Sequence, residues 1–204
     1  MGSHRFEPKN RCKAKAGCAE EKGRGKTVNT DEIKHGEEGV KLFLDCEFTQ
    51  LNQHTKLISL GLVSEVGDEF YVELTDTYQI ENCSDFVIQN VLPQLNLHRY
   101  GMPLEDAQAS LSAFLGRIEG QLEICSDAPE WDWEFFCQLA YVGHRWPSHV
   151  ANMPTNLIHL FRHFEADDIG DIALPELPHH ALLDARLLAE LYQRLKAASK
   201  FVGD

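Results

Sequence analysis

Large apolar residues are scarce in the first 38 residues of the chain and recur regularly after that point. Residues 1–38 are rich in Lys, Glu and Gly and show no hydrophobic periodicity. A segment of this composition buries too little apolar surface to offset the entropy that it loses on ordering. We therefore predict a disordered, basic N-terminal arm over residues 1–38 and a single folded domain over residues 39–204.

The pattern that starts at residue 41 predicts three consecutive β-strands. Residues 41–48, 56–64 and 68–74 are dominated by residues that favour strands, and short links separate the three segments. The second link, residues 65–68, contains a glycine that suits a hairpin turn. This arrangement predicts an antiparallel meander.

Helical periodicity dominates the remainder of the chain, where apolar residues recur at three- and four-residue steps. The predicted elements are helices over residues 84–95 and 104–118, a strand over 121–126, a helix that runs to about residue 143, and helices over 155–165 and 180–198. Three strands, helices, a further strand and more helices predict an α/β fold with a mixed sheet and helices packed against it.

Composition places the chain among soluble globular proteins. Its 204 residues are enough for one domain with a substantial core, and 43% of them are hydrophobic and 25% charged. No uninterrupted apolar stretch approaches the roughly twenty residues that cross a bilayer, and the N-terminus lacks the apolar core of a secretion signal. The six cysteines are scattered, which fits free thiols in a reducing compartment. We expect a cytoplasmic protein without a membrane partner.

Charge is distributed unevenly along the chain. The formal net charge is −13, but residues 1–30 contain eight Lys or Arg residues and three Glu residues, a balance of +5, which leaves −18 for the rest. A basic arm can contact phosphates, although many such arms are only solvated tails. An enzyme that holds its substrate through bound metal ions also needs less positive charge of its own. Net charge therefore does not decide whether the partner is a nucleic acid.

Two carboxylates in the first predicted strand carry the strongest chemical signal. Asp45 and Glu47 are separated by one residue, and alternate side chains of a strand point to the same face. Two adjacent buried carboxylates require either protonation of one carboxyl or a divalent cation between them. The alternative is an exposed polar face with Leu44 and Cys46 buried on the other side, and the pattern is short enough to arise often by chance.

Further acids and histidines lie near the ends of later elements. Asp132 follows the fourth strand at the start of a helix, where sheet proteins often place reactive groups, although an acid there also favours the helix dipole. Asp184 lies beside the leucine stripe of the last helix. His180 is one helical turn from Asp184, whereas His179 reaches the same site only from a non-helical segment, which Pro178 permits. Each histidine can also be a cap or a surface residue.

Together these motifs resemble those of the DEDDh 3'-5' exonucleases, a superfamily that includes ribonuclease T, oligoribonuclease and the proofreading subunit of the bacterial replicative polymerase. The resemblance spans about residues 41–198, and residues 43–74 are especially similar to small bacterial stand-alone 3'-5' exoribonucleases. The last motif of the family is a histidine, four residues and an aspartate, which selects His179 over His180. The matching residues are Asp45, Glu47, Asp132, His179 and Asp184.

The resemblance implies a fold, a cofactor and a mechanism. The implied fold is ribonuclease H-like, with a mixed β-sheet of antiparallel meander and parallel strands flanked by helices. The implied cofactors are two Mg²⁺ or Mn²⁺ ions, which activate water and stabilise the leaving 3'-oxygen. The metal ligands would be Asp45, Glu47, Asp132 and Asp184. His179 would act as the general base, and the product would be a nucleoside 5'-monophosphate released from a 3' end.

The sequence departs from the family pattern in two motifs. Phe48 replaces a threonine that follows the glutamate in many relatives, and Asp127 takes a position that is usually asparagine. Phe48, Leu51 and Trp131 are the candidate substrate-binding residues, because large side chains near the site can stack on or wedge the last bases. Trp131 and Trp133 are also natural core residues at a strand-to-helix junction.

Several functions are compatible with this resemblance. The first is a metal-dependent 3'-5' exoribonuclease that acts on single-stranded 3' ends, with a DNA 3'-5' exonuclease as an alternative. The second is a catalytically silent nucleic-acid-binding or adaptor module, although such a module has no need to keep four mutually repelling acids. A third is a different metal-dependent phosphohydrolase that acts on small nucleotides. Relatives often form homodimers, so the resemblance also implies a homodimer.

Overall fold

The computed structural model describes residues 39–158 and 178–201, with the side chains of residues 198–201 excepted. The predicted arm over residues 1–38 lies outside this part of the chain, so the domain boundary remains a prediction. The described elements all belong to one compact unit.

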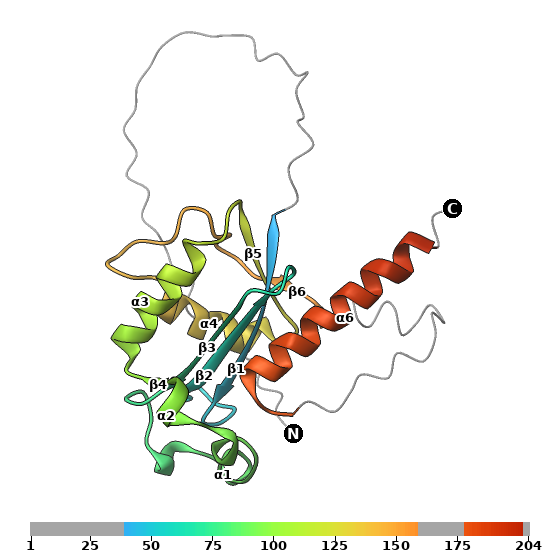
Figure 1. Ribbon diagram of the computed structural model, residues 1–204. Helices are drawn as coiled ribbons and strands as arrows, with labels where there is room; N and C mark the ends of the chain where they lie inside the picture. The colour runs from blue at the N-terminus through green and yellow to red at the C-terminus, as the bar shows by residue number, and fades with distance from the viewer. Residues whose placement is uncertain (1–38, 159–177, 202–204) are drawn as a thin grey trace, which may run out of the picture. The chain divides into compact units, whose positions relative to one another are not determined.

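Six strands of the described residues form one mixed sheet in the order β4-β3-β2-β1-β5-β6 (Figure 1). The strands are β1 (Val40–Phe48), β2 (Leu57–Ser64), β3 (Glu69–Leu74), β4 (Gly101–Met102), β5 (Leu122–Ser126) and β6 (Thr155–Asn156). The β1, β2 and β3 strands run antiparallel, whereas β5 pairs with β1, β4 with β3 and β6 with β5 in parallel. This topology confirms the predicted meander and the predicted combination with parallel strands.

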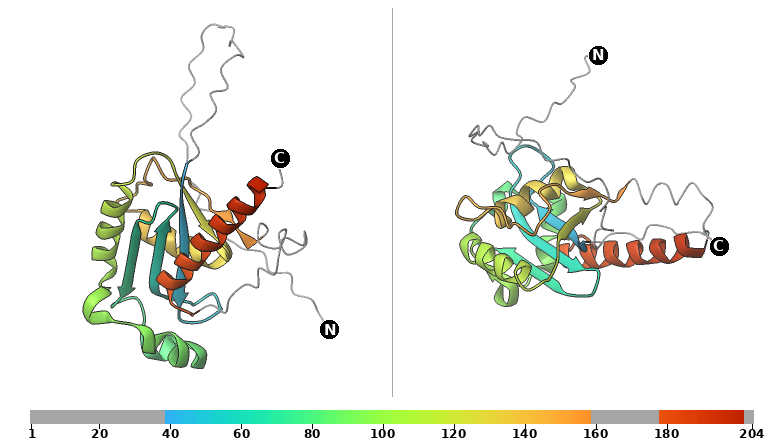
Figure 2. Two further views of the ribbon diagram at one scale, coloured as in Figure 1. Left: turned by 45° about the vertical axis from the view of Figure 1, so that its right-hand side comes forward. Right: turned by 90° about the horizontal axis from the view of Figure 1, so that it is seen from above.

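Helices cover both faces of this sheet. The helical elements are η1 (Ile80–Asn82), α1 (Asp85–Asn90), η2 (Leu92–Gln94), α2 (Leu97–Tyr100), α3 (Leu104–Leu115), α4 (Pro129–Ala140) and α6 (Ala181–Phe201). The α4 and α6 helices lie on opposite sides of the sheet (Figure 2). Among the described helices, none combines the length and the hydrophobicity that a membrane span requires.

The alternation of β1 side chains determines what each face of the sheet carries. Leu44 and Cys46 are buried in the main core with the apolar residues of α3 and α4. Phe43 points to the other face and packs against Leu188 and Leu191 of α6. Because side chains alternate along a strand, Asp45 and Glu47 share the α6 face with Phe43.

A glycine allows the start of α6 to lie directly on the sheet. Gly61 of β2 pairs with Asp45 of β1. A Cβ atom at Gly61 would lie 2.6 Å from the carbonyl carbon of Ala181 and 2.7 Å from the Cα atom of Leu182. Only a residue without a side chain permits this approach of helix and strand, and the approach brings the first turn of α6 next to Asp45.

The region between β3 and α3 differs from its prediction. One helix was expected over residues 84–95, but the structure contains α1 and the short η2 separated by Val91. Pro93 lies within η2, where its missing amide hydrogen and fixed φ angle interrupt a regular helix. The short elements α2 and β4 have too few residues for a periodic signal and were not predicted.

The predicted helix over residues 155–165 is wrong at its start. Thr155 and Asn156 form β6 beside β5, and residues 159–165 lie outside the described part of the chain. A short apolar segment cannot be assigned to helix or strand by periodicity alone. In this case pairing with an existing sheet edge decides the structure.

Candidate metal centre

Two neighbouring strand positions supply the first carboxylates of the site. Asp45 and Glu47 lie on the α6 face of β1, near the end of the strand, and both are partly buried. Leu44 and Cys46 are buried on the opposite face. The two carboxylates therefore occupy the interface with α6, and the alternative of an exposed polar face does not hold.

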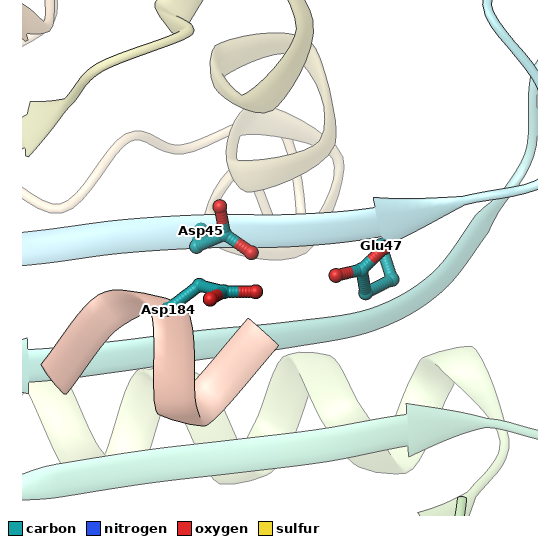
Figure 3. Close-up of side chains that lie close together, drawn as sticks. All are labelled: Asp45, Glu47 and Asp184. Atoms are coloured by element: carbon teal, nitrogen blue, oxygen red, sulfur yellow. The ribbon is translucent and has the colours of Figure 1, made fainter. Parts of the chain in front are cut away.

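The first turn of α6 adds a third carboxylate to this pair. Asp184 is 2% exposed. One ligand oxygen from each of Asp45, Glu47 and Asp184 lies within 4.8 Å of the others. Figure 3 shows the three carboxyl groups directed toward a common space between β1 and α6. Residues almost 140 positions apart in the sequence thus form one cluster that can hold a metal ion.

A second acidic group shares Asp45 with the first. Asp45, Asp127 and Asp132 also offer carboxylate oxygens within 4.8 Å of one another. Asp132 lies in the first turn of α4 and is 2% exposed, and the hydroxyl of Ser126 donates a hydrogen bond of 2.5 Å to its Oδ2 atom. Asp45 is therefore the common member of two adjacent groups, an arrangement that suits two neighbouring divalent cations.

The protonation properties of these acids reflect their burial and mutual repulsion. Burial, followed by the charges of Asp132, Glu47 and Asp184, raises the pKa of Asp45 well above its ordinary value. Burial and the neighbouring carboxylates raise the pKa of Glu47 to about 8. The same effect of burial raises the pKa of Asp132 to about 7. Without a cation, the cluster is a set of acids whose ionised forms are disfavoured.

The donor set fits a hard divalent cation. Within the described part of the chain, the Oδ1 atom of Asp184 is buried and has no hydrogen-bond partner, whereas its Oδ2 atom accepts a 2.8 Å hydrogen bond from the amide of His180. A buried carboxylate oxygen without a partner is costly, and a cation beside it removes this cost. Carboxylate oxygens are the ligands that Mg²⁺ and Mn²⁺ prefer. The residues present therefore fit the metal ions that the sequence resemblance implies.

The two histidines precede α6 and face different neighbours. His179 has a φ angle of +55°, and its ring meets the edge of the Phe86 ring with 4.8 Å between centroids. The His180 ring stacks on Tyr71, also with 4.8 Å between centroids. Since α6 begins at Ala181, His179 lies in a non-helical segment, as the sequence predicted for an approach to the acids. The imidazoles of both histidines counteract the rise that burial causes in the pKa of Asp184.

The three candidate substrate-binding residues have different surroundings. Phe48 stacks on Trp131 with 5.7 Å between ring centroids, and it is partly buried against the main core. Leu51 is 73% exposed in the loop that follows β1. Trp133 packs against Phe136 in the main core, so the core interpretation holds for this tryptophan.

Some residues of the site had only weak sequence signals. Asp127 was noted for its unusual position in the second motif, but its contribution to the second acidic group depends on the turn between β5 and α4. Gly61 is an isolated glycine in a strand, a pattern that often marks a close backbone approach. Gln94 donates hydrogen bonds to the backbone of Pro178 and His179, and no local pattern predicts a contact across this sequence distance.

Known proteins include some that are similar to this chain in sequence and others that are similar to it in fold. No family model matches the sequence. Two curated proteins named 3'-5' exoribonuclease, Rv2179c and MT2234.1 from two strains of Mycobacterium tuberculosis, are each 29% identical to the chain over 154 residues. The alignments cover 72% of this chain and 88% of each relative.

Two solved structures share the fold. The crystal structure of cell-death related nuclease 4 (CRN-4) has a TM-score of 0.56 and 14% identity over 78% of this chain. The match covers 64% of CRN-4, slightly less than two thirds of its length. The nuclease domain of 3'hExo, a DEDDh family member bound to rAMP, has a TM-score of 0.56 and 17% identity, with 79% of this chain and 94% of that domain covered. These structural similarities confirm the predicted ribonuclease H-like fold.

Proposed function

We propose that this protein belongs to the DEDDh 3'-5' exonuclease superfamily and is a metal-dependent 3'-5' exoribonuclease that releases nucleoside 5'-monophosphates. One observation carries the proposal. Carboxylates of β1 and α6 converge on a common space, and a buried oxygen of Asp184 in this cluster has no hydrogen-bond partner among the described residues. A structural role for these acids does not explain why, among the residues that the structure describes, no Lys or Arg side chain is paired with any of them.

The cation that best matches this oxygen-rich site is Mg²⁺ or Mn²⁺. Asp45, Glu47 and Asp184 would hold one ion, and Asp45 with Asp132 would hold the other. Bound ions of this kind supply positive charge that acidifies the attacking water and stabilises the leaving 3'-oxygen. The four acids then remain ionised, because the ions offset the repulsion and burial that raise their pKa values without metal.

The chain's own residues supply the proton transfer. His179 would accept the proton of the attacking water, because a neutral imidazole is a suitable base near neutral pH. Asp184 lies close enough to His179 to be influenced by its charge, which supports a position of the imidazole beside the cluster. His180 has its ring against Tyr71 and its amide on Asp184, contacts that suit a residue that orients Asp184.

The proposed substrate is the 3' end of a single-stranded RNA. Support comes from the two mycobacterial relatives, which are named 3'-5' exoribonucleases, and from the rAMP bound to the nuclease domain of 3'hExo. Phe48, Leu51 and Trp131 would contact the terminal nucleotides, since Leu51 is exposed and the stacked residues Phe48 and Trp131 directly adjoin Glu47 and Asp132 in the sequence. A cytoplasmic location and a homodimer belong to the same proposal.

A single assay distinguishes this function from its alternatives. RNA and DNA oligomers of equal sequence, each labelled at the 5' end, are incubated with the purified protein and Mg²⁺ or Mn²⁺, with a chelator as the control. The proposal predicts stepwise shortening of RNA from the 3' end, faster than for DNA and absent with the chelator. Faster shortening of DNA would identify a DNA exonuclease. Binding without shortening under either metal would support the silent binding module and contradict the proposal.

A further inference from the structure

His179, the proposed general base, has a backbone conformation that contacts with other residues must hold in place. His179 has a φ angle of +55°, in the left-handed region that residues with a side chain rarely adopt. Such a conformation persists only where surrounding contacts determine it. His179 also precedes the first residue of α6, so the regular hydrogen bonds of the helix do not hold it.

One side chain contacts both peptide groups that flank His179. The Nε2 atom of Gln94 donates hydrogen bonds of 2.7 Å to the carbonyl of Pro178 and 3.1 Å to the carbonyl of His179. The first carbonyl belongs to the peptide plane before the Cα atom of His179, and the second belongs to the plane after it. Because φ and ψ are the rotations between these two planes, Gln94 restrains the backbone angles that aim the imidazole.

Gln94 is itself held in place by its own segment. Its Nε2 atom also donates to the carbonyl of Asn90 at 2.6 Å, so its two hydrogens are shared among three carbonyl oxygens. The preceding residue is Pro93, whose ring fixes its φ angle. Leu92 and Leu95, on either side, pack against a buried cluster of Ile58, Val87 and Val91. The side-chain amide of Gln94 therefore belongs to a segment that packs against the buried residues of the domain.

We propose that Gln94 is a positioning residue for the exonuclease reaction, acting through the backbone of His179. The inference depends on the proposed function, in which His179 is the general base. Gln94 is exposed, so its loss removes few buried contacts and leaves the fold intact. Its loss frees the two peptide planes and misaligns the imidazole, and a misalignment of roughly 1 Å costs up to about 100-fold in rate.

The test compares two variants of Gln94 with a matched control. Gln94→Ala removes the donor, and Gln94→Glu keeps the size but directs a carboxylate at two carbonyl oxygens. Gln89→Ala is the control, because Gln89 is an exposed glutamine of the neighbouring α1. Steady-state kinetics on a labelled oligoribonucleotide should show kcat lowered roughly 10- to 100-fold in both Gln94 variants, with KM nearly unchanged. The control should keep the wild-type kcat.

A double-mutant cycle separates positioning of His179 from a general structural effect. In the His179→Ala background, Gln94→Ala should lower kcat no further, because both changes remove the same contribution. A wild-type kcat in both Gln94 variants would overturn the inference. If Gln94→Ala lowers kcat by the same factor with and without His179, the inference is also overturned, because the effect would then not pass through the imidazole.

A spectroscopic measurement tests the positioning of His179 independently of the proposed function. NMR spectra of the His179 ring should shift in Gln94→Ala and stay unchanged in Gln89→Ala, whether or not the protein degrades RNA. An unshifted ring would contradict the positioning contact itself. An inactive wild-type protein with a shifted ring would instead contradict the proposed function and leave the contact intact.

Discussion

Because Gly61 contacts the start of α6, adding a single methyl group in Gly61→Ala tests how the site depends on the position of this helix. In Gly61→Ala, the new Cβ atom would lie 2.6 Å from the carbonyl carbon of Ala181 and 2.7 Å from the Cα atom of Leu182, whereas ordinary contacts begin at 3.4 Å. The neighbouring atoms are backbone, so they cannot rotate away. The first turn of α6 must therefore move by roughly 1 Å, a backbone shift of the kind that overpacking a core forces.

This movement separates Asp184 from the two acids of β1. Asp184 is three residues beyond Ala181 in the same helical turn, so its carboxylate moves with the helix. A displacement of roughly 1 Å costs about 100-fold in rate when it affects a reacting group. We expect kcat of Gly61→Ala to fall by about this factor and its affinity for Mn²⁺ to weaken. The stability cost of overpacking is about 1–3 kcal/mol.

The assay measures turnover of a labelled oligoribonucleotide and Mn²⁺ binding by calorimetry, with Gly67→Ala as the control. Gly67 has a φ angle of +98°, and no atom of the described residues lies within 4 Å of an added Cβ. Its replacement strains the backbone by about 1–2 kcal/mol without displacing α6. The control should therefore lose stability but keep its turnover and its metal affinity. Wild-type turnover and Mn²⁺ affinity in Gly61→Ala would refute the reasoning.

Three further predictions concern the acids and the base. Asp45→Asn and Asp184→Ala should each abolish shortening of RNA while circular dichroism shows a folded protein; wild-type turnover in either variant would contradict the assignment. His179→Ala should lower kcat roughly 10²- to 10⁴-fold, and an unchanged rate would exclude it as the base. Without metal, the raised pKa of Glu47, about 8 against an ordinary 4.5, means that the folded state keeps a proton that the unfolded state has released. The free energy of unfolding should therefore fall as pH rises from about 4.5 to 8, and Mg²⁺ should raise the melting temperature most at the upper end. A melting temperature that rises with pH without metal, or does not respond to Mg²⁺ at pH 8, would contradict this account.

The strand that carries Asp45 and Glu47 was predictable because its signal is local. A period of two in a strand places alternate residues on one face, and burial of Leu44 and Cys46 on the other face follows from the same pattern. The structure has this arrangement in β1. The short links between the first three strands likewise predicted the meander correctly.

The histidine segment was only partly predictable. Helical geometry limited His179 to a non-helical approach, and α6 does begin after His180. The positive φ angle of His179 and its hydrogen bonds with Gln94, a residue 85 positions earlier, depend on tertiary packing. No local propensity or periodicity encodes such a contact.

The segments that were predicted wrongly are those where another physical effect outweighs periodicity. Pro93 interrupts the predicted helix over residues 84–95. Thr155 and Asn156 pair with β5 instead of starting a helix. In the second case, backbone hydrogen bonds at the sheet edge outweigh a weak local preference.

The central claim is that two divalent cations bind the shared acidic cluster. Anomalous diffraction from crystals of the protein soaked in Mn²⁺ tests it most directly. The account predicts two Mn²⁺ peaks, one contacted by Asp45, Glu47 and Asp184 and the other by Asp45 and Asp132. Crystals that diffract well but show no Mn²⁺ at these carboxylates would contradict it.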